Sequence, residues 1–148
     1  MREALGTAGW TAGRRIDTAA WTRQLVAVGF ELNDVAPALW AEFGDLRIES
    51  SPARVPGSSL HVDPVDACVD CFTEARRLER RYGENHSPLG MWSVQFRSYV
   101  GASGRVIAVG PGVMWHLGAD FAEALAYVVE GDGGVDRAER ADWLTGSA

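Results

Sequence analysis

Two cysteines are the residues of this chain whose type and spacing come nearest to a metal or redox site. Cys68 and Cys71 form a Cys-x-x-Cys pair, with His61 before it and His86, in a predicted polar loop, after it. Structural zinc usually takes its four ligands from two closely spaced pairs, but the chain has no second cysteine pair. Both cysteines also fall within an amphipathic helical pattern, where a reduced cysteine packs as a small apolar residue. We therefore expect no metal ion and no cofactor.

His61 and Asp63 are the residues best spaced for general acid–base chemistry. They are two apart, so on a strand they would share a face, and the carboxylate could orient the imidazole. Asp63 has a competing role, because it precedes Pro64 at the start of a predicted helix and can cap it. The chain also lacks lysine and any Gly-x-Ser-x-Gly, His-Glu-x-x-His, Walker or Rossmann sequence. We expect that the protein is not an enzyme, and a small hydrolase or metal-dependent enzyme is the least favoured hypothesis.

Length and composition indicate one globular domain. The chain has 148 residues, 47% of them hydrophobic, with a net charge of −6 and a pI of about 5.0. This charge disfavours nucleic-acid binding and favours a positively charged partner. No secretory signal is visible, and no segment approaches the ~18 apolar residues of a membrane span. We expect a cytoplasmic protein that binds neither nucleic acid nor membrane.

Four helices are predicted from apolar residues at helical spacing between a capping residue and a glycine. Their expected starts are Asp17, Asp34, Asp63 and Asp120, and their expected ends are Gly29, Gly44, Gly83 and Gly131. In the first helix, Trp21, Leu25 and Val28 share one face. A further short helix is expected over residues 136–144, with Trp143 as an anchor.

Strands are predicted where the apolar period changes to two. Short strands are expected at Leu46–Glu49 and Leu60–Val62. Ser87–Gly90 is expected to be a turn, and Met91–Leu117 an antiparallel meander in which Val94 is a strand residue. The order of the elements predicts a single α+β domain, with an antiparallel or mixed sheet flanked by helices.

Six short sequences are individually weak signals but form an ordered set. They are Gly9–Arg15, Glu42–Leu46, His61–Pro64, Ser87–Gly90, Gly104–Val106 and Leu117–Leu125. In this order the set resembles the third subgroup of the SUKH superfamily, which is known mainly for bacterial immunity proteins. The chain departs from that pattern at Asp45, where the family has a second glycine, and at Ala102-Ser103, where it often has an acidic residue.

The resemblance implies a SUKH-like domain over residues 9–131, with an N-terminal extension at 1–8 and a C-terminal tail at 132–148. It also implies an immunity protein that binds a cognate toxin domain, often a nuclease, and neutralises it in a stoichiometric complex without turnover. A regulatory or scaffold domain with a non-toxin partner is the alternative. Under the same resemblance, Arg14 and Arg15 have a structural use, pairing with a carboxylate such as that of Glu42.

We expect a toxin to contact the strand meander and its edges. The expected contact residues are Trp92, Gln95, Arg97 and Tyr99, together with the acids Asp45, Glu49 and Asp63. Aromatic residues and arginine are common at interface hot spots, and acidic side chains can stand in for the phosphates that a nuclease binds.

Overall fold

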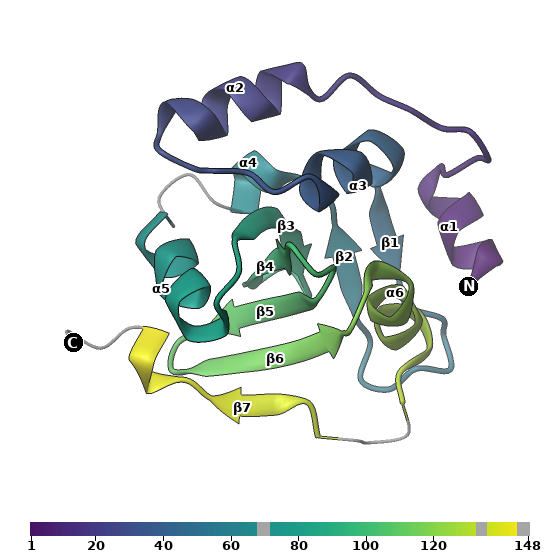
Figure 1. Ribbon diagram of the computed structural model, residues 1–148. Helices are drawn as coiled ribbons and strands as arrows, with labels where there is room; N and C mark the ends of the chain where they lie inside the picture. The colour runs from purple at the N-terminus through teal and green to yellow at the C-terminus, as the bar shows by residue number, and fades with distance from the viewer. Residues whose placement is uncertain (68–71, 133–135, 145–148) are drawn as a thin grey trace.

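The computed structural model describes residues 1–67, 72–132 and 136–144 and is built around one antiparallel sheet (Figure 1). Its strands follow one another in sequence order across the sheet. They are β1 (Arg47–Glu49), β2 (Ser59–His61), β3 (His86–Trp92), β4 (Phe96–Gly101), β5 (Val106–Gly110), β6 (Val113–Gly118) and β7 (Ala138–Arg140). Each neighbouring pair is antiparallel. The predicted α+β fold with an antiparallel meander is confirmed.

Helices surround this sheet in the described part of the chain. They are α1 (Arg2–Ala8), α2 (Ala19–Ala27), α3 (Val35–Phe43), α4 (Pro64–Ala67), α5 (Phe72–Tyr82), α6 (Phe121–Glu130) and the 3-10 helix η1 (Asp142–Leu144). In Figure 1, α1 and α6 lie beside the β1 end of the sheet and α5 lies at the other side. None of the described helices is long and apolar enough to cross a membrane.

The two faces of the sheet are covered by different helices. Trp92 of β3 packs against Tyr127 of α6, with ring centroids 6.1 Å apart. Arg97 of β4 pairs with Met91, the residue before Trp92. Arg97 in turn bonds to Glu74 of α5. Because adjacent residues of a strand point to opposite faces, α5 and α6 cover opposite faces of the sheet.

Side-chain caps begin two of the predicted helices as expected. The Oδ1 of Asp63 accepts the N–H groups of Val65 and Asp66, and the Oδ1 of Asp120 accepts that of Glu123. The third cap differs from the prediction, because Asp34 occupies the N-cap position without a side-chain bond. Asn33 caps α3 instead.

The two ends of the Asn33 side-chain amide explain why Asn33, rather than Asp34, caps α3. Its Oδ1 accepts the N–H groups of Val35 and Ala36, both at 3.0 Å. Its Nδ2 donates to the carbonyl oxygen of Val100 at 2.9 Å. An aspartate has no donor for this second bond, so the asparagine both caps α3 and ties it to the sheet.

Two of the six segments that carry the family resemblance, Gly9–Arg15 and Glu42–Leu46, contact each other. The guanidinium of Arg14 donates to the carbonyl oxygens of Glu42 and Gly44, at 2.7 and 2.8 Å. The Glu42 carboxylate instead accepts the indole N–H of Trp10 at 3.1 Å. Arg14 therefore has the structural use that the resemblance implied, but its acceptors are backbone carbonyls rather than the Glu42 carboxylate.

The turn predicted at Ser87–Gly90 is wrong, because these residues lie inside β3 and are buried. The β3–β4 register shifts between Pro88 and Gly90, so a bulge accommodates the proline within a strand. A Cβ on Gly90 would lie 1.9 Å from the His61 carbonyl oxygen. The Pro-x-Gly sequence therefore forms a β-bulge and allows β2 to approach β3 closely. His86 was expected in a polar loop, but it is buried at the start of β3.

Three other predictions about local structure are wrong. Val28 is 51% exposed, because α2 ends at Ala27. Val94 lies in the β3–β4 turn, where it is 66% exposed with φ 69°. The short helix expected over 136–144 is strand β7 followed by η1. Cys68 and Cys71 lie outside the described residues.

Candidate partner-binding surface

Two of the expected contact residues are part of the core. Trp92 is 7% exposed, and its Nε1 donates to the hydroxyl of Ser58 at 2.8 Å. Tyr99 is fully buried, and its hydroxyl donates to Oε1 of Glu74 at 2.6 Å. Neither side chain is exposed in the chain alone, because helices cover both faces of the meander at these positions; their contact with a toxin stays a prediction.

Arg97 is engaged within the molecule. Its Nε and Nη2 donate to the two carboxylate oxygens of Glu74, at 2.9 and 2.7 Å. These hydrogen bonds raise the pKa of Arg97 above its ordinary value. Burial, together with the Glu74 carboxylate, raises the pKa of Tyr99 well above 10. Glu74, Arg97 and Tyr99 therefore form one cluster, in which the Arg97–Glu74 ion pair holds α5 on β4. The Arg97 side chain lies at the edge of this cluster and is 42% exposed.

Gln95 is exposed in the turn between β3 and β4. The two residues before it, Ser93 and Val94, have φ values of 51° and 69°. Behind the turn, the partly buried rings of Phe96 and Trp115 lie 4.5 Å apart. This turn therefore presents a polar amide and an apolar side chain to solvent, with an aromatic pair next to them.

The three expected acids are divided between the two ends of β1. Asp45 is exposed, and its N–H donates to the carbonyl oxygen of Val62, so it lies beside Asp63. Asp63 is half-buried and uses its carboxylate to cap α4. Glu49 is exposed at the other end of β1, opposite Ser59 in the register. Asp45 and Asp63 are brought together, and Glu49 is not with them.

Glu49 lies on the wall of a groove with a volume of about 360 Å³. We call this the α1–β1 groove, and it is also bounded by the end of α6. Its lining residues are Met1, Glu3, Ala4, Thr7, Ala8, Arg47, Glu49, Ser50, Ser51, Pro52, Val129 and Glu130. Glu3 and Glu130 were not expected at a site. A helical pattern in Ala4, Leu5 and Ala8 would have indicated α1, but no local signal indicates that α1 packs beside β1.

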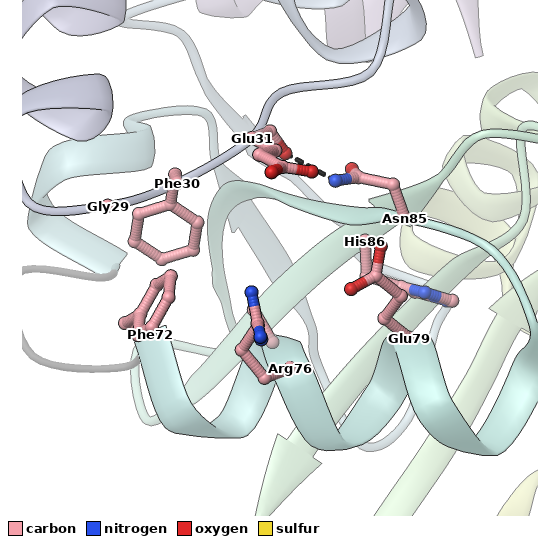
Figure 2. A pocket seen from close by; sticks show the side chains of 9 residues that line it. Gly29, Phe30, Glu31, Phe72, Arg76, Glu79, Asn85 and His86 are labelled. Carbon is pink, nitrogen blue, oxygen red and sulfur yellow. Dashed lines mark hydrogen bonds between the residues drawn. The ribbon is translucent and has the colours of Figure 1, made fainter.

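A second cavity, between α5 and the segment after α2, is too small for a substrate (Figure 2). Its volume of about 20 Å³ has room for a single water molecule. Arg76 lies over the ring of Phe72, and the side-chain amide of Asn85 donates to the Glu31 carbonyl oxygen. These are contacts within the fold, and they do not converge on an open reaction centre.

The residues proposed for enzyme chemistry are not assembled in the described part of the chain. No hydrogen bond joins the side chains of His61 and Asp63 there, and the Asp63 carboxylate is used as a helix cap. No group of three His, Cys, Asp or Glu residues suited to a metal ion occurs among the described residues. The cysteine pair lies outside them, so its role stays a prediction.

Comparison with known proteins gives one match. A family model described as SUKH-3 immunity protein matches residues 1–131. This range contains α1 to α6 and β1 to β6, including the contact of Trp10 and Arg14 with Glu42. No curated protein and no solved structure matches the chain.

Proposed function

Because the chain belongs to the SUKH-3 immunity protein family, we propose that it binds a cognate toxin domain and neutralises it in a stoichiometric complex. The observation on which this rests is the family match over residues 1–131, which is most of the chain. Neutralisation by affinity needs a stable, complementary surface and no turnover. We therefore propose that the protein is not an enzyme and acts in the cytoplasm, where a toxin would reach its target.

The net charge supports a basic toxin, such as a nuclease. The chain carries 20 acidic and 14 basic residues. A nuclease domain needs a positively charged surface to bind the phosphate backbone of its nucleic-acid substrate, and an acidic protein is attracted to the same surface. Carboxylates that occupy the phosphate positions would exclude the substrate. This is the reason that we propose a nuclease as the toxin.

We propose that the toxin contacts the Glu49 end of the sheet. Glu49 pairs with Ser59, and the carbonyl oxygen of Ser59 accepts the N–H of Ser93 in the β3–β4 turn. Glu49 and the turn that contains Gln95 therefore lie at the same end of β1, β2 and β3. Their exposed side chains can belong to one interface, whereas Asp45 and Asp63 would contact a toxin only if the interface reached the opposite end.

Co-expression tests the proposed function directly. The probe is the toxin domain encoded next to this gene, produced with the chain or with an unrelated acidic protein of similar size as the control. We expect growth only with the chain, and a one-to-one complex with a catalytically inactive toxin by light scattering after gel filtration. Loss of growth in both cultures, with no complex at micromolar concentration, would contradict the proposal. A stable complex with a non-toxin protein instead would favour the scaffold alternative.

A further inference from the structure

We propose that the α1–β1 groove binds a basic side chain, arginine or lysine, from the toxin domain. This inference rests on the proposed function and names the chemistry of the partner at one site. The groove is bounded by residues from α1, β1 and the end of α6, three elements that are far apart in the sequence. Its volume of about 360 Å³ is sufficient for a long side chain.

Carboxylates from all three elements line the groove. Glu3 lies in the first turn of α1, Glu49 ends β1, and Glu130 ends α6. The three acids lie on elements that are far apart in the sequence, so it is the tertiary fold that brings them to one groove. A cationic side chain placed among them would form charge-assisted hydrogen bonds with any of the three.

Two of the three carboxylates have no direct partner in the described part of the free chain. Among the described residues, neither Glu3 nor Glu49 has a hydrogen-bond or ion-pair partner; Glu130 is paired with the Met1 amine at 3.4 Å. Glu130 also lies at the C-terminal end of α6, where the helix dipole disfavours a carboxylate. A cation bound in the groove would therefore supply the partner that Glu3 and Glu49 lack in the free protein.

The lining of the groove suits the stem of a basic side chain. Apolar groups from Ala4, Ala8, Pro52 and Val129 line the same groove as the acids. Arginine and lysine carry three or four methylene groups that pack against apolar surface while the charged end remains at polar groups. A groove lined by both apolar groups and carboxylates therefore fits arginine or lysine better than it fits an anion or a purely apolar side chain.

Arg47 fixes the orientation of the occupant. It is the one guanidinium that lines the groove, and among the described residues it has no ion-pair partner. Arg47 and Glu49 are two apart on β1 and share a face. A cation is repelled from Arg47 and attracted to the carboxylates, so its charged end would lie toward Glu3, Glu49 and Glu130.

A neutralising double variant tests the groove. Glu3→Gln/Glu49→Gln removes two groove carboxylates, and Glu123→Gln/Asp34→Asn removes two exposed carboxylates elsewhere, so both variants have the same net charge. The probe is the inactive toxin domain encoded next to this gene, titrated at low and high salt. We expect the groove variant to bind on the order of tenfold more weakly at low salt, with a shallower salt dependence, and the control to bind as the wild type does.

A steric variant and a stability measurement separate binding from folding. Thr7→Trp places an indole in the groove from an exposed position of α1, and we expect it to weaken toxin binding without removing charge. Urea unfolding of Glu3→Gln/Glu49→Gln should be unchanged, since neither carboxylate has a hydrogen-bond or ion-pair partner among the described residues. If the wild-type chain binds the toxin and both groove variants bind equally well, the groove inference is overturned while the proposed function stands. If the wild type does not bind, the proposed function fails. A dimer of this chain that the same variants abolish would also overturn the inference.

Discussion

Glu74 on α5 accepts two parallel hydrogen bonds from the guanidinium of Arg97 on β4, at 2.9 and 2.7 Å. The carboxylate is buried, with its side chain 10% exposed, whereas the guanidinium is 42% exposed. Tyr99 donates a third bond to the same carboxylate from within the core. A buried carboxylate is stable only when its charge is paired and its oxygens are bonded. This ion pair therefore explains how an arginine-rich helix keeps an acidic residue on its inner face.

Replacing Glu74 with glutamine should destabilise the protein by about 2 kcal/mol. The change removes the charge opposite Arg97 and places amide hydrogens where Arg97 or Tyr99 now donates. We expect the urea midpoint to fall, with an unchanged m-value. Glu123→Gln is the matched control, because it removes an exposed carboxylate on α6. Equal midpoints for the two variants would show that the Glu74–Arg97 pair does not stabilise the fold.

Acid should weaken the fold through His86. The side chain is 2% exposed, its Nδ1 bonds to the Glu84 carbonyl oxygen at 3.0 Å, and its Nε2 has no partner among the described residues. Burial lowers the pKa of His86, although the Glu84 carbonyl and carboxylate oppose the shift. An unfolded histidine has a pKa of about 6.5. Below that pH the unfolded chain therefore binds a proton that the folded chain does not.

The unfolding free energy should consequently fall as the pH drops from about 6.5 toward the lower folded pKa of His86. His86→Gln cannot bind this proton, so the variant should lose less stability than the wild type between about pH 7 and about pH 5. Urea unfolding at both pH values measures the difference. Parallel losses in the two proteins would rule out His86 as a source of the acid sensitivity.

Local chemistry in the sequence predicts the elements better than it predicts the surface. Asp63 and Asp120 were recognisable as caps because a cap depends only on the next few residues. Asn33 was missed because its second bond goes to Val100, which is distant in the sequence. Trp92 was expected to contact a partner, and its burial depends on α6, which comes after three further strands in the sequence. The groove that contains Glu49 likewise depends on how α1 packs beside β1.

Gly90→Ala should be among the most damaging single changes to the sheet. A Cβ at this position would lie 1.9 Å from the carbonyl oxygen of His61, so β2 and β3 must separate to admit it. Overpacking of this kind costs about 3 kcal/mol when backbone has to move. Gly6→Ala is the control, because nothing lies within 4 Å of a Cβ there and alanine favours the helix. We expect thermal unfolding to shift down for the first variant and slightly up for the second.

Val94→Gly should stabilise the free protein. Val94 is 66% exposed and has φ 69°, a backbone conformation that is costly for a β-branched residue and ordinary for glycine. The substitution removes this strain and loses little packing, so we expect a gain of about 1 kcal/mol despite the greater freedom of the unfolded chain. Val26→Gly makes the same change at an exposed position of α2 and should destabilise, since glycine disfavours a helix. Urea unfolding of both variants gives the two signs, and a loss of stability in Val94→Gly would mean that the valine contributes more by contact than its backbone costs.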